Sequence, residues 1–169
     1  MKLNEIQLSP KIVRLILNLF PPLLFNRISI QNIKKDFMEV KVRIRHSIIN
    51  KNFHRTIFGG TIFSAIDPYF PIMYWQIFSR KKLPIEVWIK KAEISYKNPA
   101  ETDLHLKFIL KEEDIKKALK GLQKDGRHQV WHEVEAFDEN GMICAEAKVL
   151  VYIRNYKNLN LNTSKITIQ

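Results

Sequence analysis

The feature that most limits the fold is a long apolar segment in the first half of the chain. Residues 56–78 are almost wholly apolar, with Gly59 and Gly60 at the front. Apolar side chains lie on more than one side of a helix, at positions 62, 65, 66, 69, 70, 73, 74 and 77. A helix that is apolar all round must be enclosed by the rest of its domain. We therefore predict a buried helix that continues from about Gly60 and is kinked by Pro68 and Pro71.

Alternating apolar and polar residues predict a half-buried strand over residues 37–49. The side chains on its inward face are Val40, Val42, Ile44, His46 and Ile48. Similar signals predict further strands at residues 28–33, 85–96, 104–110, 128–137 and 142–153. One enclosed helix followed by an antiparallel meander indicates an α+β architecture, in which a curved sheet wraps around that helix.

Turn and helix signals organise the second half of the chain. The sequence Asp-Glu-Asn-Gly at 138–141 predicts a hairpin between the last two strands. Residues 112–124 have an acidic first turn, basic later turns and a following Gly126, which predict a helix. Neither a repeat nor a low-complexity linker interrupts the pattern. We expect a single domain over residues 1–156 and a flexible tail over residues 157–169.

The N-terminal region contains an apolar stretch over residues 12–25. It is too short and too interrupted for a membrane span, and it lacks a signal-peptide cleavage site. Its helical spacing forms one stripe: Ile12, Leu15, Ile16 and Leu19. We predict an amphipathic helix, ended by Pro21-Pro22, whose stripe packs on its own domain. A helix on a membrane surface is the alternative, since Lys11 and Arg14 suit an anionic interface.

Charge and cysteine content limit the partners. The chain has 28 Lys and Arg against 17 Asp and Glu, a net charge of +11. This excess favours anionic partners such as nucleic acid, acidic lipid or coenzyme A. The lone Cys144 excludes an internal disulfide, and the histidines lack metal-ligand spacing. We expect a cytoplasmic protein without a metal, with Cys144 as a packing residue.

Two features of the apolar segment are candidates for chemistry. Gly59 and Gly60 open a helix whose first N–H groups lack partners, so they could hold a thioester carbonyl or oxyanion; a tight turn is the alternative. Asp67 is expensive to bury unless it is paired or lies beside a cavity, which suits a general base. Since Pro68 follows it, Asp67 could instead cap a helix N-terminus.

Polar residues on either side of this segment could bind substrate. The loop before it contains Asn50, Asn52, His54, Arg55 and Thr56, which either position a ligand or satisfy turn backbone. Arg80, Lys81 and Lys82 follow it, and they either end a helix or receive the phosphates of coenzyme A.

Residues 52–67 resemble a known family. Asn52 is followed after six residues by Phe58-Gly59-Gly60, and Asp67 lies seven residues after Gly60. This spacing is similar to that of hotdog-fold acyl-CoA thioesterases of the phenylacetate-pathway type, which have Asn, His-Gly-Gly and Asp or Glu. The chain looks closer still to a hotdog branch with Phe-Gly-Gly and Asp-Pro. Other similarities to that branch are Pro21-Pro22, Asp36-Phe37, Val87-Trp88, Lys97-Asn98-Pro99 and Val151-Tyr152-Ile153-Arg154.

The resemblance implies an α+β hotdog fold that works as a homodimer or dimer of dimers. It implies acyl-CoA or acyl-carrier-protein ligands in a tunnel between protomers, and no cofactor besides the coenzyme A of the substrate. By position, Asp67 is the general base or nucleophile, Gly60 with Gly59 supplies the backbone donor, and Asn52 orients water or substrate. Substrate-binding candidates are Phe58, His54, Thr61, Arg80, Lys81 and Lys82.

One difference from the thioesterases opens a second interpretation. Phe58 stands where that family has histidine, which removes a polar group beside the site. The main hypothesis is hydrolysis of an acyl thioester. The alternatives are a non-catalytic module that binds acyl-CoA or lipid and, on charge alone, a nucleic-acid-binding protein.

Overall fold

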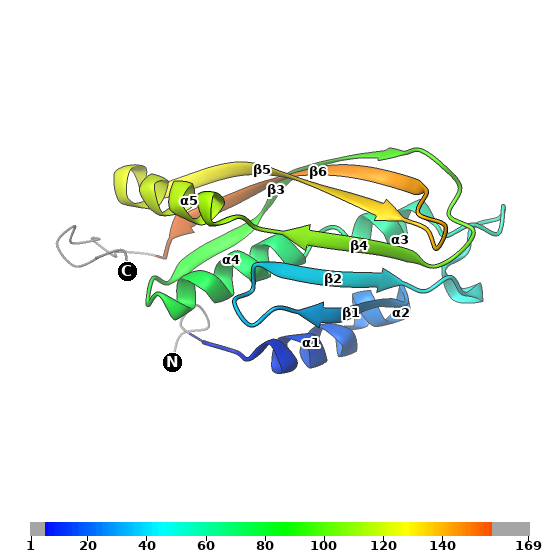
Figure 1. Cartoon of the computed structure of the whole chain (residues 1–169), viewed down its shortest axis with the longest axis horizontal. Coiled ribbons are helices and arrows are strands. Elements are labelled where there is room, and N and C mark those ends of the chain that lie inside the picture. The colour runs from blue at the N-terminus through cyan, green and yellow to red at the C-terminus, as the bar shows by residue number, and fades with distance from the viewer. Residues whose placement is uncertain (1–5, 157–169) are drawn as a thin grey trace.

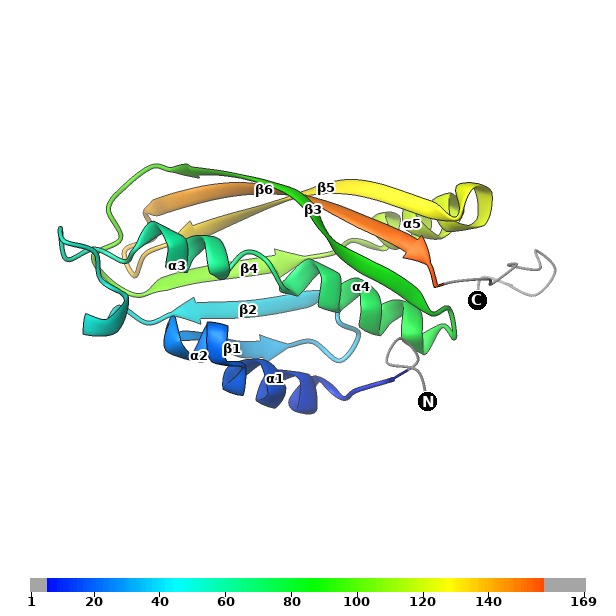
Figure 2. The same ribbon diagram turned by 180° about the vertical axis from the view of Figure 1, so that it is seen from behind.

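The computed structural model describes residues 6–156, which form a six-stranded antiparallel sheet curved around two helices (Figures 1 and 2). The strands are β1 (Ile28–Ile33), β2 (Glu39–Ile44), β3 (Ile85–Tyr96), β4 (Leu104–Ile109), β5 (Arg127–Phe137) and β6 (Ile143–Asn155), in the order β1-β2-β4-β5-β6-β3. The predicted α+β architecture is confirmed. The predicted tail at 157–169 lies outside the described residues.

Five α-helices are distributed along residues 6–156. They are α1 (Pro10–Leu19), α2 (Pro21–Phe25), α3 (Gly59–Ser64), α4 (Tyr69–Arg80) and α5 (Glu112–Asp125), with a 3₁₀ turn, η2 (Ile48–Asn50). The helix predicted at 112–124 is confirmed, and Gly126 ends it with a positive φ of 67°. Within residues 6–156 we find no helix long and apolar enough to cross a bilayer.

Helix α4 is the centre of the core. Its fully buried side chains include Tyr69, Phe70, Met73, Tyr74 and Phe78. Aromatic contacts join it to the sheet: the Tyr69 ring lies 4.7 Å from that of Phe108, and Phe70 stacks 4.4 Å from His132. The sheet therefore encloses α4, as its uniform hydrophobicity predicts.

The prediction of one continuous kinked helix is wrong, because α3 ends at Ser64 and α4 begins anew at Tyr69. Pro68 is the residue before the first turn of α4, and Pro71 is its third residue. A helix needs no N–H donor at these positions, whereas a continuous helix would lack two of its hydrogen bonds there. The two prolines thus favour a break over a kink.

Strand β2 is shorter than predicted. Val40, Val42 and Ile44 are buried as expected, but the strand ends at Ile44 and Ile48 is exposed. Asn50 explains the early end, because its side chain donates to the Arg45 carbonyl at 2.9 Å and accepts from the Ser47 N–H at 3.0 Å. These bonds hold the chain in a tight loop in place of an extended strand.

Helix α1 lies along the outer edge of β1, but the stripe predicted to pack inward faces solvent. Val13 is buried, whereas the predicted stripe is exposed: Ile12, Leu15, Ile16 and Leu19. The polar side of the helix meets the strand, since the Asn18 side chain bonds both the N–H and the carbonyl of Ile30. An edge strand needs partners for its open backbone, and meeting that need turns the stripe outward.

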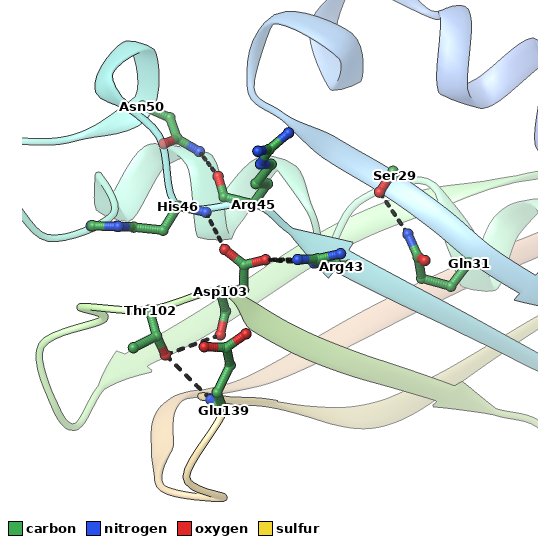
Figure 3. A network of polar contacts seen from close by, with 9 residues as sticks. All are labelled: Ser29, Gln31, Arg43, Arg45, His46, Asn50, Thr102, Asp103 and Glu139. Atoms are coloured by element: carbon green, nitrogen blue, oxygen red, sulfur yellow. Dashed lines mark hydrogen bonds and ion pairs between the residues drawn. The ribbon is translucent and has the colours of Figure 1, made fainter.

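An ion-pair network joins the ends of β2 and β4 (Figure 3). Asp103 pairs with the Arg43 guanidinium and accepts a hydrogen bond from the His46 N–H at 2.8 Å. Burial raises the pKa of Asp103, but the hydrogen bonds from His46 and Arg43 and the nearby cationic charges outweigh burial and lower it. The network anchors the loop that leads toward α3.

We predict that Asp103→Asn lowers the free energy of unfolding by about 1–3 kcal/mol at neutral pH, because a charged acceptor is lost. The pKa of Asp103 in the folded protein lies below its ordinary value of 3.8. Its contribution is therefore complete above that value and is lost as the pH falls through the folded pKa, so wild type and variant converge in acid.

Urea unfolding at pH 7 and in acid measures this difference. Glu101→Gln is the matched control, since this exposed acid two residues away has no hydrogen bond or ion pair with any described residue. An equal loss of stability in both variants would refute the network's role.

Candidate functional site

The loop between η2 and α3 is held by Asn52. Its side-chain oxygen accepts from the N–H groups of His54 and Thr56, and its amide donates to the Thr56 hydroxyl at 2.8 Å. These bonds occupy the Asn52 side chain within its own turn and support the turn alternative. The side chain of His54 is exposed on the same loop.

The loop is also tied to α2 and α3 through buried amides. Asn50 is 4% exposed and donates to the Asn26 carbonyl at 3.0 Å. Thr61, buried in the first turns of α3, donates its hydroxyl hydrogen to the Asn26 side chain at 2.8 Å. The Thr61 hydroxyl, predicted to bind substrate, therefore takes part in this structural network. The sequence did not predict that contact.

Two aromatic rings lie against the paired glycines. A Cβ on Gly60 would lie 2.3 Å from the ring of Phe58, and one on Gly59 would lie 3.0 Å from the ring of Tyr96. The Tyr96 hydroxyl donates to the Gly59 carbonyl at 2.9 Å, so β3 touches the start of α3. Only glycine lets both rings approach this backbone without displacement.

The N–H groups of Gly59 and Gly60 have no acceptor among the described residues. Both stand in the first turn of α3, where the helix itself offers no partner. The Phe58 side chain, 57% exposed, stands beside them. The start of α3 thus combines unpaired donors with an accessible apolar ring.

Asp67 lies in the break between α3 and α4. It is exposed, and no hydrogen bond or ion pair joins it to a described residue. Since Pro68 is the capping residue of α4 and no side chain bonds that helix end, Asp67 does not act as the N-cap. Its carboxylate faces solvent and is free to meet a ligand or another chain.

Gly60 and Asp67 of one chain are well separated. Asp67 follows Gly60 by seven positions, so their backbones are roughly 10 Å apart at the helical rise. The two groups are therefore not adjacent along one chain.

An apolar pocket of about 310 Å³ lies between α4 and β3. Its lining residues are Pro71, Ile72, Trp75, Ile85, Glu86, Val87 and Trp88. Pro71 follows Asp67 by four residues, but Asp67 is not among the lining residues. An apolar substrate group fits such a lining.

The three basic residues at the end of α4, Arg80, Lys81 and Lys82, have different surroundings. Arg80 donates to the Gln76 carbonyl and the Leu8 carbonyl and lies 4.4 Å above the Phe37 ring. Burial lowers the pKa of Arg80, which these internal partners hold in place. Lys81 and Lys82 are exposed and follow the helix, so only these two are accessible to a phosphate.

A buried polar pair in the core was not identified from the sequence. The Tyr74 hydroxyl lies 3.0 Å from Nε2 of His132, and both residues are buried between α4 and β5. Burial lowers the pKa of His132 and raises that of Tyr74, so both are neutral at pH 7. Periodicity places His132 on a strand, but it does not identify its partner on α4.

The sequence predicts that Cys144 is a packing residue and that the protein holds no metal. Cys144 is buried on β6, as its packing role predicts, and burial raises the pKa of its thiol. Across residues 6–156 we find no group of three His, Cys, Asp or Glu side chains arranged to hold a metal ion.

The curved sheet around α4 defines a hotdog fold, and solved structures share it. A Pseudomonas aeruginosa protein described as a probable thioesterase matches with a TM-score of 0.76 and 16% identity, over 90% of this chain and 99% of its own. Zebra fish thioesterase superfamily member 2 matches with a TM-score of 0.61 and 17% identity, over 86% and 99%. The E. coli PaaI protein from the phenylacetic acid degradation operon matches with a TM-score of 0.58 and 12% identity, over 85% and 90%.

The chain belongs to the family described as "Domain of unknown function (DUF4442)", whose model matches residues 10–153. No curated protein matches the chain. The family assignment and the structural similarity agree over nearly all of the described residues.

We predict that Gly60→Ala lowers the free energy of unfolding by about 1 kcal/mol, because the new methyl group displaces the Phe58 ring. In a Phe58→Ala background the same substitution should carry no cost, since nothing then occupies the space. Urea unfolding of the four proteins of this double-mutant cycle measures the coupling. Equal effects of Gly60→Ala in both backgrounds would show that the ring does not oppose the methyl group.

Proposed function

We propose that the protein hydrolyses acyl thioesters, with Asp67 of one protomer and the Gly60 N–H of its partner acting on one carbonyl. The observation that carries the proposal is the pair of unsatisfied groups: the Asp67 carboxylate and the Gly60 N–H both lack partners among residues 6–156. The motif spacing from Asn52 to Asp67 and the thioesterases among the structural neighbours support it. The similarity to the Phe-Gly-Gly and Asp-Pro branch belongs to this proposal.

The open edge of the sheet supports a homodimer. Strand β3 is twelve residues long and, within residues 6–156, pairs with β6 alone; Trp88 and Tyr96 on it are exposed. Such an edge favours pairing with another strand. A second copy of the chain at β3 would bring its α3 and α4 close to those of the first, because Tyr96 already contacts Gly59.

The reaction needs only groups that the two chains supply and a water molecule. The Asp67 carboxylate takes a proton from water, and the resulting hydroxide attacks the thioester carbon. The oxygen of the carbonyl gains negative charge, which the Gly60 N–H stabilises. The carbon–sulfur bond then breaks, Asp67 returns the proton to the thiolate, and a carboxylic acid and a thiol leave.

The pocket between α4 and β3 supplies a place for the acyl group. Its lining is mainly apolar and it extends from Pro71 along α4 to Trp75 and β3. We propose acyl-CoA as the substrate, with Lys81 and Lys82 as the accessible cations for its phosphates. An acyl-carrier protein would present the same thioester and meet the same two groups.

We predict that Asp67→Asn lowers turnover by about 10²-fold to 10⁴-fold, the usual contribution of a general base. Because Asp67 is exposed and unpaired, the free energy of unfolding of the protein should change by less than about 0.5 kcal/mol. Release of free thiol from short, long and aromatic acyl-CoA measures turnover, and urea unfolding measures stability. The exposed acid Glu101 offers a matched control in Glu101→Gln. Inactivity of the wild type across the whole panel would contradict an enzyme.

A second function, binding of acyl-CoA or lipid without hydrolysis, is favoured by Phe58. Its ring lies against Gly60 where the thioesterases have a polar histidine. Saturable binding of acyl-CoA with no thiol release would support this function over hydrolysis. Turnover that appears only in Phe58→His would assign the loss of activity to that ring.

A further inference from the structure

Exposed apolar side chains gather on α1, on α2 and at the residue between them. Seven large side chains on these helices are between 43% and 70% exposed: Ile12, Leu15, Ile16, Leu19, Phe20, Leu24 and Phe25. We call these seven residues the α1–α2 face. The helices bury only Val13 and Leu23, so most of their large apolar side chains face away from the domain.

The α1–α2 face is held rigidly on the domain. Asn18 bonds both backbone groups of Ile30, and Arg14 donates to the Gln31 carbonyl at 3.1 Å. In Figure 2 both helices lie along the β1 edge, below the sheet and away from β3. The orientation of the α1–α2 face is therefore set by these contacts with β1.

A second group of exposed apolar side chains adjoins α2. The 3₁₀ turn η2 exposes Ile48 and Ile49, at 89% and 64%. Asn50 in the same turn donates to the carbonyl of Asn26, the residue that ends α2. The end of α2 and η2 are thus joined by a hydrogen bond, and both expose apolar side chains.

Positive charge accompanies this surface. Residues 6–35, which span α1, α2 and β1, contain five Lys and Arg and no Asp or Glu. On α1 the helical periodicity places Lys11 at the border of the apolar stripe, whereas Arg14 lies on the side toward β1 and donates to the Gln31 carbonyl; both residues are exposed.

We propose that the α1–α2 face docks the protein on an anionic lipid bilayer, with α1 lying in the plane of the interface. Large aliphatic and aromatic side chains, bordered by Lys11 and without an acidic residue between residues 6 and 35, match acyl chains below negatively charged headgroups. The same surface on a second copy would offer Lys11 no acidic partner from residues 6–35. Nucleic acid would match the charge but would leave the large aliphatic side chains without apolar partners.

The experiment is sedimentation with lipid vesicles, which contains no thioester and so succeeds or fails independently of the proposed hydrolysis. We expect the full chain to sediment with vesicles of phosphatidylcholine and phosphatidylglycerol, and not with phosphatidylcholine alone. Binding should weaken as salt rises, because screening reduces the attraction of the cations. Lys11→Gln should weaken it about fivefold, the effect of one juxtamembrane cation.

A matched pair of double variants tests the apolar contribution. Leu15→Gln/Leu19→Gln removes two side chains of the α1–α2 face and should lower vesicle binding at least about tenfold. Ile109→Gln/Met142→Gln removes two side chains of similar exposure elsewhere and should leave binding unchanged. Unfolding curves confirm that each variant is folded.

Three results would overturn the proposal. The first is absence of binding to anionic vesicles at low salt, and the second is equal binding by both double variants. The third is an oligomer in sedimentation equilibrium that Leu15→Gln/Leu19→Gln converts to a smaller species, because a second copy of the chain would then cover this face.

Discussion

Enclosure of α4 by the sheet is the constraint on which the rest of the structure depends. Tyr69, Phe70, Met73, Tyr74 and Phe78 are each no more than 1% exposed. Each buried aromatic or aliphatic side chain contributes about 1.5–3 kcal/mol, so these five residues represent a large share of a marginal net stability. The sheet curves around α4 and covers the side that holds these five residues, with Phe108 of β4 and His132 of β5 in contact with the helix. The positions of Asp67 and of the pocket follow, because they lie where this enclosed helix begins and where it meets β3.

Much of this fold follows from local pattern. Alternation and turn residues locate β3 to β6 and the hairpin at 138–141, and the acidic start and Gly126 locate α5. Two of the predictions that failed did so because local pattern does not contain the deciding interaction. The break at 65–68 depends on where prolines need no hydrogen bond, and the outward stripe of α1 depends on β1, whose open edge takes up Asn18 and Arg14. Amphipathic spacing shows that a helix has a stripe, but the neighbouring strand decides which way it faces.

The candidate site shows a similar division. Motif spacing selects Gly60 and Asp67, and the structure leaves the Gly60 N–H and the Asp67 carboxylate without partners in residues 6–156. It also shows local roles that spacing does not reveal, since Asn52 completes a turn, Thr61 bonds Asn26 and Arg80 bonds backbone carbonyls. Residue type alone cannot separate a ligand-binding amide from one that satisfies a loop, because both need the same donors and acceptors. The Tyr74–His132 pair was missed for a related reason: its members lie 58 residues apart and only the closed fold joins them.

The two edges of the sheet differ in a way that lets both proposals hold at once. Strand β1 has its outer backbone covered by α1, whereas β3 has one side free. Dimer formation at β3 therefore leaves the α1–α2 face uncovered, and docking of that face on lipid leaves β3 available. The order β1-β2-β4-β5-β6-β3 separates these edges by the full width of the sheet. Because an edge strand that is neither covered nor paired favours association, β3 is the edge at which we propose pairing with a second copy of the chain. The same argument explains why the chain places a helix at one edge and leaves Trp88 and Tyr96 exposed at the other.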